Sequence, residues 1–315
     1  MLDLIIIGGG PAGIAAGVYA ARKRLKTVLV AEEIGGQSTV SEGIENWIGI
    51  PKISGVDLAK SFRVHLDAVA GGKDSTLTLA LGERVVALDH RAGKFFVKTK
   101  ADKEYVAKAV LVATGAGRRK LAVPGADKFE NKGVTYCASC DGPLFGDMDV
   151  VVVGGGNAGF ETAAQLLAYA KSVTLIHRHK DFKADPITVE KVSAHPNMRI
   201  ITHAEPLEVL GDQFVTGITY TDKDSLAGQA GEVKTLTASG VFVEAGVIPN
   251  TDFAENLVEL DAIKRIKVDP RNQRASVDGV WAAGDCTDEL YHQNNIAAGD
   301  GVKALEDIYL WVKKQ

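Results

Sequence analysis

The chain of 315 residues contains only three cysteines, Cys137, Cys140 and Cys286. A secreted scaffold held together by disulfides needs a higher density of cysteine, so that class of protein is excluded. Two of the three cysteines lie close together, which is typical of redox or metal chemistry rather than of structural cross-links. The sparse use of cysteine predicts a protein of a reducing compartment, and we expect a cytoplasmic location.

Long hydrophobic runs and blocks of basic charge are also missing. Apolar runs such as Val150–Val153 have the length of a strand, well short of the roughly 18 residues that cross a bilayer. The segment Met1–Ile7 lacks the basic start and the cleavage site of an export signal. With 36 basic and 40 acidic side chains, the net charge is −4, which argues against nucleic-acid binding. We therefore expect neither a membrane nor a nucleic acid as a partner.

Glycine, in contrast, is abundant, with 34 residues, and several of them belong to an internal repeat. The segment 3–13 (DLIIIGGGPAG) recurs without a gap as 149–159 (DVVVVGGGNAG). Each copy has a short apolar run typical of a buried parallel strand, a G-x-G-x-x-G motif and a stretch expected to be helical. A second apolar strand follows each copy, at 27–30 and 173–176. The repeat predicts two βαβ units of the Rossmann type.

The three glycines of each motif have separate physical roles. The first permits the tight turn after the strand, and the second lets the backbone approach a pyrophosphate at the positive end of the helix. The third lets helix and strand pack closely. Two motifs in register predict two bound dinucleotides. In order, the glycines are Gly8, Gly10 and Gly13 in the first copy and Gly154, Gly156 and Gly159 in the second.

The end of the second strand distinguishes the two ligands. Glu32 and Glu33 stand there in the first copy, whereas Arg178 and His179 occupy the aligned positions of the second. A carboxylate accepts hydrogen bonds from ribose hydroxyls, whereas cationic groups suit a 2′-phosphate. The second site therefore favours NADPH, with a solvated basic strand end and an NADH site as the alternatives.

Two further apolar strands, within 110–117 and 241–250, end in turns that contain glycine and are interpreted as crossings between domains. The first domain is then discontinuous and comprises residues 1–114 and 245–315, while the second, 115–244, is inserted into it. The sequence thus predicts an α/β fold of two Rossmann-like, three-layer ββα dinucleotide-binding domains. Glycines at both crossings would permit hinge motion.

A strand at 279–283 ends in Gly284 and Asp285, and a helix is expected from about Ala297. An acidic residue at the end of a strand can bind the hydroxyls of a polyol, and the N-terminus of the following helix can stabilise negative charge. We expect Asp285 to contact a ligand, with a helix cap as the alternative.

The motif Cys137-Ala-Ser-Cys140-Asp141 precedes the strand of the second repeat. Two thiols at this spacing can form a small-loop disulfide that accepts two electrons. A zinc site would need four ligands, so a redox dithiol is predicted and no metal is expected. Asp141 is a candidate general acid, with a cap or turn role as the alternative, and Cys286 is expected to be buried and structural.

Eight motifs together span nearly the whole chain: Gly8–Gly13, Gly35–Gln37, Glu45–Trp47, Ala113–Gly115, Cys137–Asp141, Gly154–Glu161, His177–Arg178 and Gly284–Asp285. They resemble those of the low-molecular-weight thioredoxin reductases. The resemblance implies a homodimeric flavoprotein with FAD in the discontinuous domain and NADPH or NADH in the inserted one. Electrons would pass from NAD(P)H via FAD and a Cys137–Cys140 disulfide to thioredoxin or a similar small dithiol protein.

The resemblance also implies which residues are functional. Cys140 would face the flavin, Cys137 would attack the partner's disulfide, and Asp141 would transfer the thiol protons. FAD would be contacted by Gly8, Gly10, Pro11, Ala12, Gly13, Glu32, Gly36, Gln37, Asn46, Thr114, Gly284, Asp285 and Gln293. The pyridine nucleotide would be contacted by Gly154, Gly156, Asn157, Ala158, Arg178, His179 and Lys183.

Three departures from the family pattern leave the electron donor open. His179 and Lys183 replace arginines that grip the 2′-phosphate, Gly159 stands where many members have Ala or Ser, and 292–295 differs from the usual Arg-Gln-Ala. One alternative is a related flavoprotein that takes electrons from ferredoxin or a deazaflavin. Another serves a peroxiredoxin system, as the similar flavoprotein of alkyl hydroperoxide reductase does. A redox-sensing nucleotide-binding protein without turnover is the alternative outside the enzymes.

Overall fold

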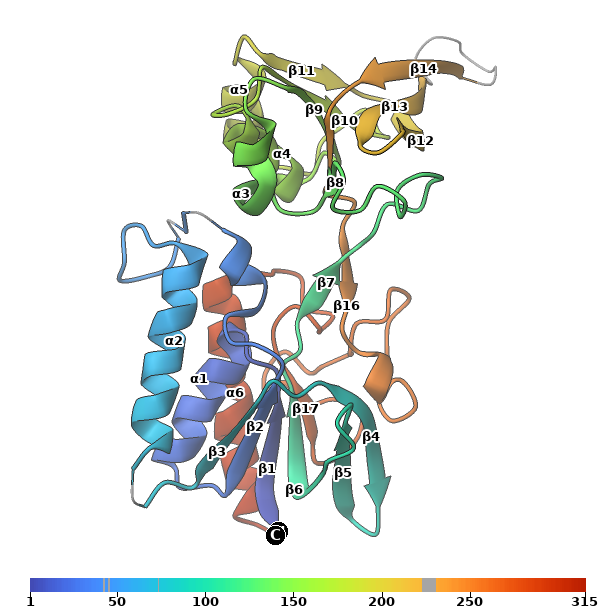
Figure 1. The fold of residues 1–315 in the computed structure, drawn as a ribbon. Helices are drawn as coiled ribbons and strands as arrows, with labels where there is room; N and C mark the ends of the chain where they lie inside the picture. Colours follow the sequence, from blue (N-terminus) through green and yellow to red (C-terminus); the bar gives the residue numbers. More distant parts are fainter. Residues whose placement is uncertain (42, 45, 73, 223–230) are drawn as a thin grey trace. The chain divides into compact units, whose positions relative to one another are not determined.

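The computed structural model describes residues 1–315 apart from 42, 45, 73 and 223–230, and apart from the side chains of residues 139 and 140. The chain divides into two units. Unit 1 comprises Met1–Gly117 and Ile248–Gln315, and unit 2 comprises Arg118–Val247. β7 (Ala116–Arg118) pairs with β16 (Val247–Pro249) where the chain passes between the units (Figure 1). Unit 2 is thus inserted into unit 1.

The sheet of unit 1 has the strand order β3-β2-β1-β6-β5-β4, with β17 also paired to β6. The first half of β6 pairs with β5 in the antiparallel direction, and its second half pairs with β17 in the parallel direction. A parallel sheet and an antiparallel meander therefore share one strand. The strands are β1 (Leu2–Ile7), β2 (Thr27–Ala31), β3 (Leu77–Leu81), β4 (Val85–Arg91), β5 (Lys94–Thr99), β6 (Glu104–Val112) and β17 (Val280–Ala282).

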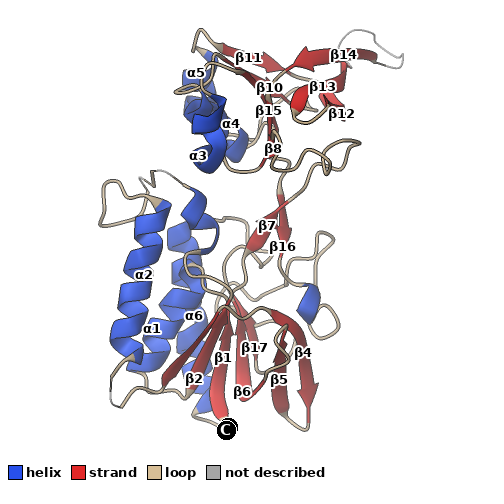
Figure 2. Cartoon of the chain, in the orientation of Figure 1, coloured by secondary structure: helices blue, strands red, loops and turns tan. Residues whose placement is uncertain are grey.

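Helices cover one face of this sheet (Figures 1 and 2). Along β1, Leu4 and Ile6 pack in the core under the helices, whereas Ile5 and Ile7 pack in a second core on the other face. Burial on both faces is the physical reason for the uninterrupted apolar run. The helices are α1 (Pro11–Arg22), η1 (Gly36–Val40), α2 (Gly55–Ala70), η3 (Asp252–Ala254) and α6 (Asn294–Val312), the last beginning three residues before the expected start.

Unit 2 repeats the arrangement with a parallel sheet, β11-β10-β9-β15-β8, and an antiparallel sheet, β12-β13-β14. Along β9, Val150 and Val152 pack against the helices, whereas Val151 and Val153 pack toward the antiparallel strands. The predicted α/β class with two Rossmann-like units is therefore confirmed. The elements are β8 (Val134–Thr135), α3 (Ala138–Asp141), η2 (Gly142–Phe145), β9 (Asp149–Val153), α4 (Asn157–Leu166), β10 (Ser172–Ile176), α5 (Pro186–Ser193), β11 (Met198–Ile201), β12 (Ala204–Gly211), β13 (Val215–Asp222), β14 (Glu232–Thr237) and β15 (Gly240–Val243). Among the described helices, none is long and apolar enough to span a membrane.

Candidate functional site

The first glycine loop joins β1 to α1 in unit 1. Gly8 has a φ of +121°, and a Cβ there would lie 2.1 Å from the carbonyl oxygen of Ala113. A Cβ on Gly13 would lie 2.0 Å from the carbonyl oxygen of Gly8. The first and third glycines of the motif are therefore required by the packing of the protein against itself.

The second glycine of the motif is different. A Cβ on Gly10 would meet no atom of the described residues within 4 Å, although Gly10 is the N-cap of α1. The first N–H groups of a helix have no partner within the helix, and they favour an anion. The loop thus leaves space beside a helix N-terminus, which is the geometry that a pyrophosphate requires.

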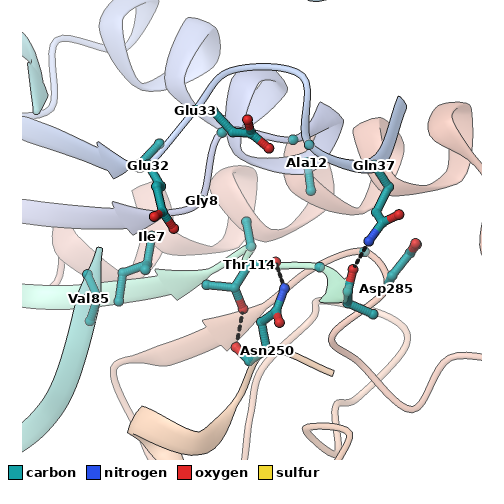
Figure 3. A pocket seen from close by; sticks show the side chains of 18 of the residues that line it. Ile7, Gly8, Ala12, Glu32, Glu33, Gln37, Val85, Thr114, Asn250 and Asp285 are labelled. Atoms are coloured by element: carbon teal, nitrogen blue, oxygen red, sulfur yellow. Dashed lines mark hydrogen bonds between the residues drawn. The ribbon is translucent and has the colours of Figure 1, made fainter. Parts of the chain in front are cut away.

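A cavity of about 460 Å³ opens beside this loop, within the size range of cofactor sites. Its walls come from segments far apart in the sequence, which meet at the carboxyl ends of β1, β2, β6 and β17 (Figure 3). Ligands of open α/β sheets bind at this edge. Of the predicted FAD contacts, the lining includes Gly8, Gly10, Pro11, Ala12, Glu32, Gly36, Gln37, Thr114, Gly284 and Asp285.

Three predicted FAD contacts are not among the residues that line the cavity. Gly13 is buried behind the loop. Asn46 and Gln293 bond to each other, with the Asn46 side-chain amide donating to Oε1 of Gln293 at 2.9 Å. They therefore join two loops of unit 1. Glu45, which belongs to the Glu45–Trp47 motif, lies outside the described residues.

Sequence reasoning missed Asn250, which also lines the cavity (Figure 3). The Thr114 hydroxyl donates to the Asn250 carbonyl at 2.7 Å, and the Asn250 side-chain amide donates to the Thr114 carbonyl at 3.0 Å. In addition, Nε2 of Gln37 donates to the Ala116 carbonyl. These bonds join the N-terminal and C-terminal parts of unit 1 at the cavity wall. The available signal in the sequence is the Pro249-Asn250 pair after the second crossing.

Carboxylates are prominent in the cavity wall. Glu83 accepts hydrogen bonds from Nζ of Lys103 at 2.6 Å and from the Tyr105 hydroxyl at 3.0 Å, and the Lys103 bond lowers the pKa of Glu83. Glu32 lies 3.9 Å from the guanidinium of Arg84. Carboxylates that stay ionised accept hydrogen bonds from ribose hydroxyls.

Asp285, also in the wall, is paired with His292 at 3.5 Å between Oδ1 and Nδ1, and the bond to Asp285 raises the pKa of His292. A histidine pKa raised above its ordinary value of about 6.5 stabilises the fold below that pH, and the contribution is lost as the pH rises through the folded-state pKa. We expect His292→Ala to destabilise the FAD-loaded protein by at most about 1 kcal/mol near pH 6, because both side chains are about one-third exposed. Near pH 8.5 the melting temperatures should converge. An equal loss at both pH values would contradict this assignment.

The glycine loop of unit 2 has the same geometry as the first. Gly154 has a φ of +133°, and a Cβ there would lie 2.1 Å from the carbonyl oxygen of Glu244. A Cβ on Gly159 would lie 2.0 Å from the carbonyl oxygen of Gly154. Gly156, the N-cap of α4, has no described neighbour within 4 Å of such a Cβ. The two loops are thus equivalent in packing as well as in sequence.

The segment after β10 is fastened to this second loop. Oδ1 of Asn157 accepts the Asp185 N–H at 2.7 Å, and the Lys183 N–H donates to the Gly155 carbonyl at 3.3 Å. Ala158 is exposed in the first turn of α4. These contacts bring the predicted residues Asn157 and Lys183 together at the glycine loop.

The basic residues at the end of β10 differ in character. A Cβ on Gly155 would lie 2.6 Å from the His177 ring, and burial lowers the pKa of His177, so this ring is neutral near pH 7. Arg178 and His179 are exposed, and Nε of Arg178 donates to Nε2 of His179 at 3.1 Å. Lys183 is exposed as well. The positive charge at this site therefore comes from Arg178 and Lys183.

The C-x-x-C motif lies on the short helix α3 and the residue before it. The Asp141 N–H donates to the Cys137 carbonyl at 3.1 Å. Thr135, the last residue of β8, donates its hydroxyl to Oδ2 of Asp141 and accepts the Cys137 N–H at 3.3 Å. Sequence reasoning missed Thr135. The side chain of Cys140 lies outside the described residues.

The third cysteine, Cys286, is fully buried in the core of unit 1, as predicted. Burial raises the pKa of its thiol to about 11. Since the thiolate is the reactive form, Cys286 is inert near neutral pH.

The chain matches the family described as pyridine nucleotide-disulphide oxidoreductase over residues 2–301, so it belongs to that family. It is 39% identical over 310 residues to an alkyl hydroperoxide reductase of Staphylococcus epidermidis, which covers 98% of this chain and 59% of the relative. It is 38% identical over 302 residues to an NADH dehydrogenase of Bacillus subtilis, which covers 96% of this chain and 57% of the relative. The chain thus spans less than two-thirds of the length of these relatives.

Among solved structures, thioredoxin reductase of Lactococcus lactis matches with a TM-score of 0.92 and 30% identity over the full length of both chains. The chain is therefore a thioredoxin reductase-like flavoprotein oxidoreductase. Its family implies binding of FAD and of a pyridine nucleotide.

Proposed function

We propose that the chain is a flavin-dependent protein-disulfide reductase that passes electrons from NAD(P)H to thioredoxin or a similar small dithiol protein. The observation that carries this proposal is the open second glycine, Gly10 in unit 1 and Gly156 in unit 2, in one chain that also contains a C-x-x-C motif. Two dinucleotide sites and a dithiol are the parts that electron transfer from a nucleotide to a disulfide needs. The resemblance extends the proposal to a homodimer.

The donor set of the unit 1 cavity fits FAD. Space beside Gly10 at the start of α1 suits the pyrophosphate, Glu32 suits the ribose hydroxyls, and Asp285 suits the hydroxyls of the flavin side chain. Thr114 and Gln37 are held by backbone carbonyls in the same wall. These residues would bind and orient the cofactor.

The loop of unit 2 suits the pyridine nucleotide. Gly156 would receive the pyrophosphate, and Arg178 and Lys183 would pair with a 2′-phosphate, which favours NADPH over NADH. Asn157 supports the site by holding the segment that carries Lys183.

Disulfide exchange is assigned to unit 2. When bound, FAD accepts a hydride from the nicotinamide and supplies the electron pair that reduces a disulfide. The Cys137 thiolate attacks the partner's disulfide, forms a mixed disulfide and releases one partner thiolate. Cys140 then attacks the Cys137 sulfur, which releases the second partner thiolate and restores the Cys137–Cys140 disulfide. Asp141 takes and returns the thiol protons.

The test is an anaerobic titration of the FAD-loaded protein with NADPH and, in parallel, with NADH, followed at the visible flavin band. Bleaching by either nucleotide, followed by reduction of thioredoxin, supports the proposal. A flavin that neither nucleotide bleaches contradicts it and directs the search to ferredoxin or deazaflavin donors.

Arg178→Ala is expected to raise the Kd for NADPH about tenfold and to leave the Kd for NADH unchanged. Loss of one charge-assisted hydrogen bond to a phosphate costs about 1.5 kcal/mol, which corresponds to this factor. Lys191→Ala is the matched control, because it removes one exposed positive charge of unit 2 from α5. Equal weakening of both nucleotides would show that Arg178 does not recognise the 2′-phosphate.

A second candidate follows from the 39% identity to the alkyl hydroperoxide reductase of Staphylococcus epidermidis. In that case a peroxiredoxin system would be the electron acceptor in place of thioredoxin. Parallel turnover assays with oxidised thioredoxin and with an oxidised peroxiredoxin distinguish the two.

A further inference from the structure

Thr135 occupies a fixed place beside the redox motif. It ends β8, where it pairs with Phe242 of β15, and only 6% of its surface is exposed. Because the sheet holds its backbone, the hydroxyl has a defined direction. That hydroxyl contacts two groups of the motif at once, the Asp141 carboxylate and the Cys137 N–H.

The two contacts determine how the hydroxyl is used. The Cys137 N–H can only donate, so Oγ1 of Thr135 accepts that bond and its one proton is available for the Asp141 carboxylate. When Asp141 carries a proton, the hydroxyl can turn and accept it through its second lone pair. A hydroxyl can therefore hold this carboxyl group in both of its protonation states.

We propose that Thr135 is a positioning residue for Asp141 in thiol–disulfide exchange. The inference rests on the proposed function, in which Asp141 exchanges a proton with the thiols. Because Thr135 also binds the Cys137 backbone, it keeps the carboxyl group and the attacking cysteine in register while the proton moves. A valine has the same shape and lacks the hydroxyl, whereas a serine keeps it.

The test uses the FAD-loaded protein, reduced with dithiothreitol and freed of reductant, and the small disulfide 2,2′-dithiodipyridine as the probe. A Cys137 thiolate breaks the S–S bond of the probe, forms a mixed disulfide and releases one thiopyridone. Cys140 then releases the second thiopyridone and restores the intramolecular disulfide, so the oxidation of the dithiol balances the reduction of the probe. The rate is measured across a range of pH.

Thr135→Val is expected to slow this reaction about tenfold and to change its pH profile, because loss of a positioned proton-transfer group costs about 10²-fold or more and mispositioning costs part of that. Thr135→Ser should react like the unmodified protein. In an Asp141→Asn background, Thr135→Val should have no additional effect, since both substitutions remove the same function.

Ser172→Ala is the matched control. Its hydroxyl donates to Asp149 at 2.6 Å at the start of β9, at the opposite end of the same sheet from Thr135. It should leave the rate and the pH profile unchanged.

Three results would overturn the inference: an unchanged rate for Thr135→Val, an equal defect in Thr135→Ser, or an equal slowing by Thr135→Val in the Asp141→Asn background. Failure of the proposed function is read separately. If Asp141→Asn reacts at the unmodified rate, then Asp141 has no proton-transfer role and the positioning role of Thr135 falls with it.

Discussion

Gly10→Val is expected to give a folded protein that has lost FAD. Gly10 has φ and ψ of −79° and −178°, an extended conformation that valine adopts readily, and its missing Cβ would meet no described atom within 4 Å. The fold therefore tolerates the side chain, whereas a pyrophosphate in that space does not. We expect FAD affinity to fall at least about 100-fold, or about 2.8 kcal/mol at 1.4 kcal/mol per factor of ten. The ratio of flavin to protein absorbance after purification, with a melting curve, measures both effects.

The repeat supplies two controls for this experiment. Gly156→Val, the equivalent change in unit 2, should retain FAD and lose bleaching by the nucleotide, because Gly156 is also extended and open. Gly13→Val should fail to fold, since its Cβ would lie 2.0 Å from the Gly8 carbonyl oxygen. If Gly10→Val retained a full complement of FAD, the assignment of this loop to the pyrophosphate would be wrong.

Cys140→Ser is expected to lower thioredoxin turnover at least about 10³-fold, the scale of loss when a reacting nucleophile is removed. The serine cannot resolve the mixed disulfide between Cys137 and the partner, so a covalent adduct should accumulate. Non-reducing electrophoresis and intact mass measure it, and dithiothreitol should release it. Bleaching of the flavin by the nucleotide should persist, because it does not need the dithiol.

The other cysteines define the controls for the trapped adduct. Cys137→Ser should be equally inactive and should trap much less partner, since Cys137 is the attacking thiol in the proposal. Cys286→Ala should leave turnover unchanged, because that thiol is fully buried and its pKa is about 11. An adduct formed equally well by Cys137→Ser would reverse the roles assigned to the two thiols.

The sequence was sufficient to predict the Rossmann units because their determinants are local. Apolar runs such as Ile5–Ile7 occur where a strand is buried on both faces, and the glycine spacing follows from backbone contacts such as that of Gly13 with Gly8. The start of α6 was placed late, at Ala297, because Asn294 and Asn295 obscure the apolar period of its first turn.

The residues that the sequence did not reveal act through contacts over long separations or through strand geometry. Asn250 reaches Thr114 across 136 positions. Glu83 depends on Lys103 and Tyr105, which lie 20 and 22 positions away on the antiparallel meander. Thr135 lies only two positions before the C-x-x-C motif, yet its role depends on the direction that β8 gives its hydroxyl. No motif spacing marks such partners.

The cavity wall of unit 1 has a consequence for how the protein matures in the cell. Gly8 and Glu32 are translated early, whereas Asn250 and Asp285 follow the whole of unit 2. Domains fold as they emerge from the ribosome, so unit 2 has its complete sequence available while the cavity of unit 1 is still unfinished. Cofactor loading is therefore a late event in biogenesis, and a chain truncated before residue 285 would be synthesised without a complete flavin site.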